Sequence, residues 1–229
     1  MYVVPLAVAT VVIALLAAVG SSREPAYGGR ALSAWLPMLP TPSVRRESSD
    51  PAAEAIRAMG SNSVPYLLKW IRYEKPPWRA AIARAVNSIV GRVRPAGVFA
   101  TDAKDKARAQ RAMYALIILG PKAEGAVGEL TKMLYETNNP ASTTYAPMTL
   151  AAIGKKGLPP LVAVLTNQQT TSLVRCRAMG NIGAMGTNAL PCVPDLRQAQ
   201  ESSSWIVRRD ATNVLRRIDP ETMAKWVEE

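Results

Sequence analysis

The chain contains no histidine, and this absence removes several kinds of catalytic and metal-binding chemistry. Histidine is the usual general base at neutral pH, a common zinc ligand and the usual partner of a serine or cysteine nucleophile. Mechanisms based on carboxylates or lysine would need another motif, and the sequence has no GxSxG, SxxK, P-loop or GxGxxG pattern. We therefore expect a protein that is not an enzyme and holds no metal or cofactor.

Aromatic residues are also scarce, at 6% of the 229 residues with a single phenylalanine. The hydrophobic content of 48% comes mainly from Ala, Leu, Val, Ile and Met, a balance that favours packed helices over sheets. This amount of apolar material is enough to bury a core, so the composition predicts a folded, all-α protein.

Only two cysteines occur, Cys176 and Cys192, and without histidine they are too few for a structural zinc site. Two alternatives remain open for them: small buried residues, or one disulfide in an oxidising compartment. A helical hairpin that turns just past Gly186 would bring the two cysteines toward each other.

Residues 2–20 form an uncharged hydrophobic segment in which Thr10 is the only polar side chain after Tyr2. At about 1.5 Å per residue, a helix of this length nearly crosses a hydrocarbon core of about 30 Å. Residues 1–21 are therefore predicted to be a transmembrane anchor or a signal segment. The length of the run favours a retained anchor, whereas the small residues Ala18 to Gly20 would suit signal cleavage.

The next segment, residues 22–50, is rich in proline, serine and glycine and is predicted to be a tether. Its one apolar stretch, residues 31–36, contains Trp35 and is predicted to form a short helix that caps the structure that follows. The side of the membrane on which the rest of the chain lies stays open. Several arginines follow the hydrophobic segment, and the positive-inside rule alone would place the following residues in the cytoplasm.

A repeat of about 33 residues dominates the rest of the chain, residues 51–229. Its turn residues Gly120, Gly154, Gly186 and Asp219 are 34, 32 and 33 residues apart. A large apolar residue lies four positions before each turn and an alanine lies eight before, which is one face of a helix. The apolar residues are Leu116, Leu150, Ile182 and Leu215, and the alanines are Ala112, Ala146, Ala178 and Ala211.

An upstream unit fits the same rule, with Gly60 as its turn. The 60 residues from Gly60 to Gly120 hold nearly two units, so one repeat, near residues 76–105, is predicted to be interrupted. Within it we expect a helix from Trp78 and a loop from Pro95 to Lys104. Each unit is expected to be a helical hairpin that buries its apolar face only by stacking on its neighbours, with residues 31–36 and 223–227 as caps.

The stretches that begin at Leu173 (LVRCRAMGNIGAMGTNALPCVPDL) and Ile206 (IVRRDATNVLRRIDPE) resemble bacterial HEAT-like repeats of the phycobilisome-lyase type. Together with the hydrophobic leader and the tether from Glu24 (EPAYGGRALSAWL), they resemble exported bacterial HEAT-repeat proteins. The shared feature is the repeat scaffold, so the resemblance does not imply bilin chemistry.

This resemblance implies a right-handed α-solenoid of antiparallel helix pairs, HEAT-like or armadillo-like, that is used mainly for binding proteins. It also implies that Arg175 and Arg208 brace the next unit through a carboxylate. The sequence departs from the family pattern at Gly128, where proline usually stands, and at Gly180, inside a helix.

Basic residues are concentrated between Lys69 and Arg111, where eleven lysines and arginines face three acidic residues. This excess supplies most of the net charge of +11. The candidate interaction patch consists of Lys69, Arg72, Lys75, Arg79, Arg84, Arg92 and Arg94. It is either a solvated helix face or a surface for anionic lipid, an acidic protein or nucleic acid.

Four aromatic residues lie at helical spacings among aliphatic residues and are predicted to belong to the core or to a cap: Tyr66, Trp70, Trp205 and Trp226. Taken together, the sequence predicts a membrane-anchored scaffold that binds another protein, with its body outside the cytoplasm. The alternative is a basic helical module that binds nucleic acid or anionic lipid, and a cytoplasmic location would favour that alternative.

Overall fold

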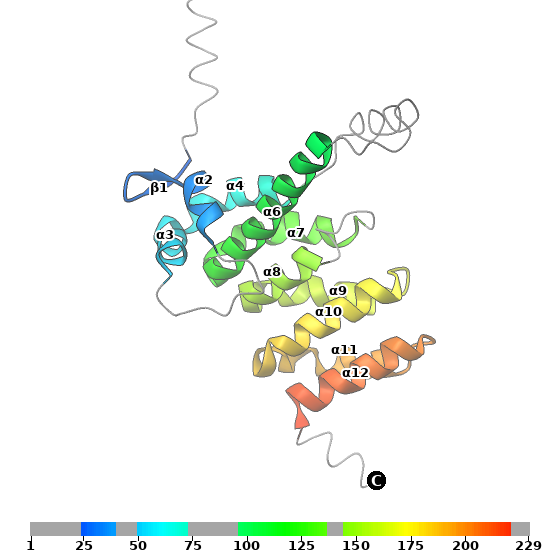
Figure 1. Cartoon of the computed structure of the whole chain (residues 1–229). Coiled ribbons are helices and arrows are strands. Elements are labelled where there is room, and N and C mark those ends of the chain that lie inside the picture. Colours follow the sequence, from blue (N-terminus) through cyan, green and yellow to red (C-terminus); the bar gives the residue numbers. More distant parts are fainter. Residues whose placement is uncertain (1–23, 40–49, 73–95, 137–143, 221–229) are drawn as a thin grey trace, which may run out of the picture.

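The described part of the protein is mostly helical. The computed structural model describes residues 24–39, 50–72, 96–136 and 144–220, and most of these residues lie in helices. Figure 1 shows the helices following one another along a stack, with a small hairpin next to the first of them. For the described residues, the prediction of an all-α protein is confirmed, apart from this two-stranded hairpin.

The helices of the described ranges come mainly as consecutive pairs, each joined by a short 3-10 segment. The first pair is α3 (Pro51–Met59), η2 (Gly60–Ser63) and α4 (Val64–Ile71), and the second is α6 (Ala96–Leu119), η3 (Gly120–Ala126) and α7 (Val127–Leu134). The third is α8 (Ala146–Ile153), η5 (Gly154–Lys156) and α9 (Leu158–Thr166), and the fourth is α10 (Ser172–Ala184), η6 (Gly186–Cys192) and α11 (Val193–Gln200). The last described helix is α12 (Trp205–Ile218).

Local sequence signals set the starts of these helices. Asp50 caps α3, because its carboxylate accepts a hydrogen bond of 2.9 Å from the backbone N–H of Ala52. Proline lies in the first two positions of α3, α4, α8, α9 and α11, where its missing N–H costs no helical hydrogen bond.

The apolar stripe of the repeat is the core of the structure. Leu116, Leu150, Ile182 and Leu215 are each at most 1% exposed, and the alanines four residues before them are fully buried. Helix α6 packs on α8, α8 on α10, and α10 on α12. One continuous cluster of buried residues therefore runs from Leu32 to Ile218, and each helix pair completes its burial against its neighbours.

The turns that follow the helices show why glycine stands there. Gly60 and Gly154 have φ angles of 58° and 82°, which side chains with a Cβ rarely adopt. Gly120 and Gly186 have similar φ angles, of 53° and 59°. Asp219 differs from these glycines, because it ends α12 with φ −140° and ψ 65°. The last unit therefore ends without the positive φ angle of the glycine turns.

The segment from Glu24 to Leu39 is a folded unit that packs on the first two helix pairs. It contains the antiparallel strands β1 (Ala26–Tyr27) and β2 (Arg30–Ala31), then helix α2 (Leu32–Trp35) and the 3-10 turn η1 (Leu36–Met38). We call this unit, residues 24–39, the N-terminal cap. The sequence predicted a short helix here, and the hairpin before it was not predicted.

Three leucines of the N-terminal cap join the common core. Leu32, Leu36 and Leu39 are each at most 2% exposed, and this part of the chain packs against α3 and α6. The carboxylate of Glu24 accepts a hydrogen bond of 3.0 Å from the backbone N–H of Ser33, which holds the start of the hairpin against α2. The N-terminal cap thus covers the apolar face that the first pair would otherwise expose.

Helix α6 begins at Ala96, where the sequence analysis predicted a loop extending to Lys104. That prediction is wrong for residues 96–104. The segment lacks the apolar stripe, but it contains three alanines and Lys104, which have high helix propensity, and it continues directly into the buried half of the helix. Propagating an existing helix adds a hydrogen bond per residue without a new nucleation step, so continuity outweighs the missing stripe.

Several predictions fall outside the described residues. These are the membrane-directed segment 1–21, the tether between residues 40 and 49, the helix from Trp78 and the cap at 223–227. Among the residues that the structure does describe, none of the helices is both long and apolar enough to span a membrane.

Two glycine substitutions should have opposite effects on stability. A Cβ on Gly157 would lie 1.9 Å from the carbonyl oxygen of Leu150, so Gly157→Ala should lower the free energy of unfolding by about 1–3 kcal/mol. Gly180 is exposed on α10 with no atom within 4 Å of such a Cβ, so Gly180→Ala should raise it by about 0.5–1 kcal/mol. Urea unfolding midpoints would measure both, and a wild-type midpoint for Gly157→Ala would contradict the close approach.

Candidate functional site

The predicted basic patch is described only at its start. Lys69 lies exposed on α4, and Arg72 follows the last residue of that helix. Its other members, Lys75, Arg79, Arg84, Arg92 and Arg94, lie outside the described residues. The structure therefore tests the patch at two positions, of which Arg72 is the informative one.

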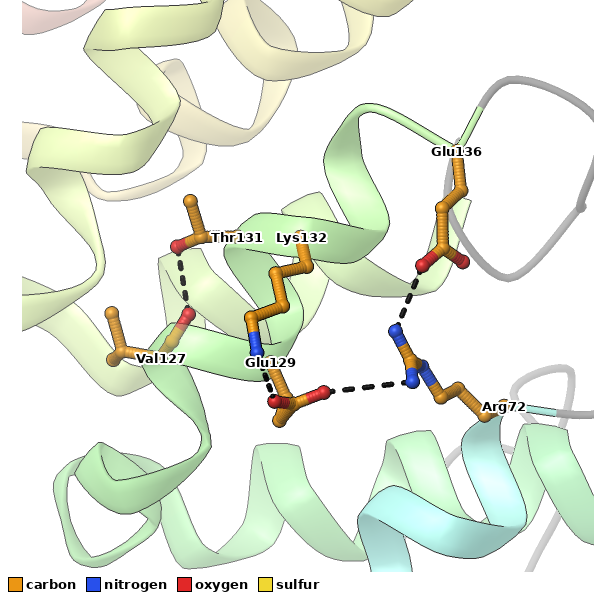
Figure 2. Close-up of polar contacts among 6 residues, drawn as sticks. All are labelled: Arg72, Val127, Glu129, Thr131, Lys132 and Glu136. Carbon is orange, nitrogen blue, oxygen red and sulfur yellow. Dashed lines mark hydrogen bonds and ion pairs between the residues drawn. The ribbon is translucent and has the colours of Figure 1, made fainter.

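Arg72 is paired with one carboxylate on α7 and with another just after that helix. Its Nη2 lies 2.8 Å from Oε1 of Glu136, and its Nη1 lies 3.6 Å from Oε2 of Glu129 (Figure 2). Lys132 holds the same Glu129 at 2.7 Å, so two cations and two carboxylates form one neutral group. Arg72 is thus not a free cation of an interaction surface, because its guanidinium links α4 to α7.

The cations of this group shift the pKa of Glu129. The hydrogen bond from Lys132, then the charges of Lys132 and Arg72, lower the pKa of the Glu129 carboxyl, while burial acts in the opposite sense. A carboxyl with a lowered pKa stabilises the folded state above its unfolded pKa, and this contribution is lost as the pH falls through the folded pKa. The link between α4 and α7 therefore weakens in acid.

Arg175 is buried, with only 8% of its surface exposed, and within the described ranges its partners are not the carboxylate that the resemblance implied. Its Nε donates a 2.9 Å hydrogen bond to the carbonyl of Leu165, and its Nη1 donates to the Ser202 hydroxyl at 3.4 Å. Leu165 belongs to the preceding pair and Ser202 to the following loop. Arg175 thus braces neighbouring segments, but through a carbonyl and a hydroxyl.

Arg208 makes the same kind of contact on the next helix. Its Nη1 donates to the carbonyls of Ser202 and Ser203, at 2.7 and 2.9 Å. Both arginines therefore meet at the loop between α11 and α12, residues 201–204. The carboxylate role that the resemblance implied for them is corrected by these partners.

The two cysteines are separate thiols in the structure. Cys176 is half-buried on α10 near Asp210 of α12, whereas Cys192 is buried and donates to the carbonyl of Ala189 at 2.9 Å. Burial, with a smaller contribution from a nearby aspartate, raises the pKa of each thiol to about 11. Both thiols are therefore protonated and weakly nucleophilic at neutral pH.

Large apolar side chains are exposed where one helix pair connects to the next. Trp205 is 60% exposed at the start of α12, and Leu173 is 58% exposed at the start of α10. Tyr135 after α7 and Met148 near the start of α8 are also exposed. Figure 1 shows the α9–α10 and α11–α12 connections on the same side of the stack. We call the four exposed side chains Tyr135, Met148, Leu173 and Trp205 the loop edge.

The exposure of Trp205 corrects a prediction. Its ring lies outside the core, with the guanidinium of Arg209 5.2 Å from the ring centre, because the buried stripe of α12 starts at Val207 and Trp205 points off that stripe. Tyr66 and Trp70 are half-buried against the core as predicted, with ring centres 6.4 Å apart. Trp226 lies outside the described residues.

Within the described ranges, no three Cys, Asp or Glu side chains are grouped so that they could hold a metal ion. A polar hollow of about 450 Å³ lies beside Arg175, between the ends of α9 and α11. Asp195 and Glu201 line it, but with no histidine in the chain and with both thiols protonated, it lacks a paired nucleophile and base.

Removing the guanidinium of Arg72 should loosen α4 from α7 only modestly. Because the side chains of Arg72, Glu129 and Glu136 are all more than a third exposed, we expect Arg72→Met to lower the free energy of unfolding by about 0.2–1 kcal/mol. A double-mutant cycle with Glu136→Gln, measured by urea unfolding, would isolate the pair. A coupling energy of zero at low salt would contradict the link.

Comparison with known proteins adds no further assignment. No protein-family model matches the sequence, and no curated protein matches it. The candidate surfaces are therefore assigned from their geometry: the neutral group around Arg72, the arginine-braced loop at 201–204 and the exposed loop edge.

Proposed function

We propose that this protein is a membrane-tethered, non-catalytic scaffold, a HEAT-like right-handed α-solenoid that binds another protein on its surface. The stacking of consecutive helix pairs supports the solenoid, as do the turns at Gly120, Gly154 and Gly186 with their spacings of 34 and 32 residues. A stack of this kind offers a long, rigid surface built from equivalent positions of successive units.

The observation that carries the binding role is the loop edge. Tryptophan, tyrosine and arginine are the residues most enriched at the centres of protein interfaces, and here Trp205 lies exposed with Arg209 over its ring. Leu173 lies exposed at the start of α10, the helix that packs on α12. A partner can bury the apolar surface of these side chains, and little side-chain conformational entropy is lost when it does so.

A photo-crosslinking residue in place of Trp205 should therefore capture the partner in intact cells. The same residue at Asn213, which is exposed on the same helix, is the matched control. We expect one discrete adduct at position 205 and none at position 213, and Leu173→Asp should abolish the adduct. Equal yields at the two positions, or no adduct at either, would count against the loop edge as the binding surface.

We propose that the hydrophobic residues 2–20 tether the protein to the membrane and that the helical stack lies outside the cytoplasm. In bacterial spheroplasts, protease added from outside should digest a C-terminal tag, and the mass of the tagged protein should show whether the leader is retained. Protection of the tag until lysis would place the body in the cytoplasm. That outcome would favour the second candidate function, a basic module that binds nucleic acid or inner-leaflet lipid, which the net charge of +11 supports.

A further inference from the structure

A second hollow separates the N-terminal cap from helix α6. Its volume is about 580 Å³, within the range of small-molecule sites. It is lined by Ser33, Leu36 and Pro37 of the N-terminal cap and by Lys104, Asp105, Ala107, Arg108 and Arg111 of α6. We call it the cap hollow. One wall is thus a helix face, and the other is the short helix that follows the hairpin.

The cap hollow is basic. Lys104, Arg108 and Arg111 lie at spacings of four and three residues, so they share one face of α6. Asp105 is the one acidic residue of the lining, which leaves an excess of two positive charges. The carboxylate of Glu24, which accepts a hydrogen bond from the backbone N–H of Ser33, is not part of the lining. The lining therefore attracts an anion.

Arg108 is held in place by an aromatic ring, and Arg111 has one donor that is unsatisfied among the described residues. The guanidinium carbon of Arg108 lies 4.7 Å from the centre of the Trp70 ring, which fixes its position by a cation–π contact. The Nε of Arg111 is buried and has no hydrogen-bond partner within the described structure. Because this Nε is shielded from solvent, an anion in the cap hollow would be attracted by the positive charges of the lining and not by a vacant donor.

From this arrangement we infer that the cap hollow binds a phosphate group. Two guanidinium groups and an ammonium group match the oxygens of a phosphate, and the Ser33 hydroxyl offers a further donor. The volume exceeds that of phosphate alone, so the ligand is an organic phosphate whose apolar part meets Leu36 and Pro37. No covalent step is involved.

Two sources share this chemistry: a phospholipid headgroup and a soluble phosphate ester. The lipid source rests on the proposed membrane tether. Glu24 follows Gly20 by four residues, or at most about 14 Å of extended chain, so an inserted segment at residues 2–20 would keep the N-terminal cap near the headgroups. The cap hollow would then orient the stack relative to the membrane.

The test uses the full chain in an uncharged detergent, with thermal unfolding as the readout. Inorganic phosphate and glycerol phosphate should raise the midpoint of the wild-type protein in a concentration-dependent way. In the Lys104→Gln, Arg108→Gln double variant the apparent dissociation constant should rise at least about tenfold. Lys106→Gln, which removes an exposed charge from the same helix outside the cap hollow, should leave it unchanged.

A second variant keeps the test decisive if the double variant fails to fold. Ala107→Glu places a carboxylate in the lining of the cap hollow and should abolish the phosphate response while α6 remains helical. If neither phosphate compound shifts the wild-type midpoint, or if all variants respond as the wild type does, the phosphate site is overturned.

Lipid nanodiscs separate the two sources. If a headgroup is the ligand, nanodiscs with phosphatidylglycerol should stabilise the wild-type protein more than nanodiscs with phosphatidylcholine, and Ala107→Glu should remove the difference. Equal stability in both, together with a response to glycerol phosphate, would support the site and assign it to a soluble ester. The detergent measurement does not depend on membrane orientation or tethering. It therefore tests the phosphate site even if the proposed membrane tether is wrong.

Discussion

The structure depends on one constraint: a pair of short helices cannot bury its own apolar face. Leu150 on α8 is fully buried only because α6 lies on one side and α10 on the other. The same holds along the chain, so the cluster of buried residues is continuous and not divided into separate cores. Burial of one leucine is worth about 1.5–3 kcal/mol, so the loss of one pair would withdraw stabilisation from both neighbours.

The same constraint explains what the sequence could predict. Residues that must face a neighbour in every unit recur at a fixed spacing, which is why Ala112, Leu116 and their equivalents were identifiable from periodicity alone. The turn glycines were recognisable for a related reason, since Gly60 and Gly154 adopt backbone angles that other residues avoid. Both signals arise from short-range geometry, which can be predicted from residue types and their spacing along the chain.

Features that depend on which elements meet were not predictable in this way. Arg72 contributes to a basic stretch when charges are counted along the chain, but its partners Glu129 and Glu136 are more than fifty residues away in sequence. Trp205 was wrongly predicted to lie in the core, because a single apolar residue at the start of a helix does not show whether it faces the buried stripe or the solvent. The hairpin at Ala26–Ala31 did carry a local signal, the Gly28-Gly29 pair between residues suited to strands, and this signal was missed.

The contacts of Arg175 and Arg208 have a consequence for how such a chain can change. Both guanidinium groups bind main-chain carbonyls, of Leu165 in one case and of Ser202 and Ser203 in the other. A carbonyl is present whatever side chain its residue carries, so the one side chain on which these contacts depend is Ser202, whose hydroxyl also accepts from Arg175. The other residues beside the two arginines could therefore change during evolution without a compensating substitution at either arginine, and the exposed side chains would be free to adapt to a new partner.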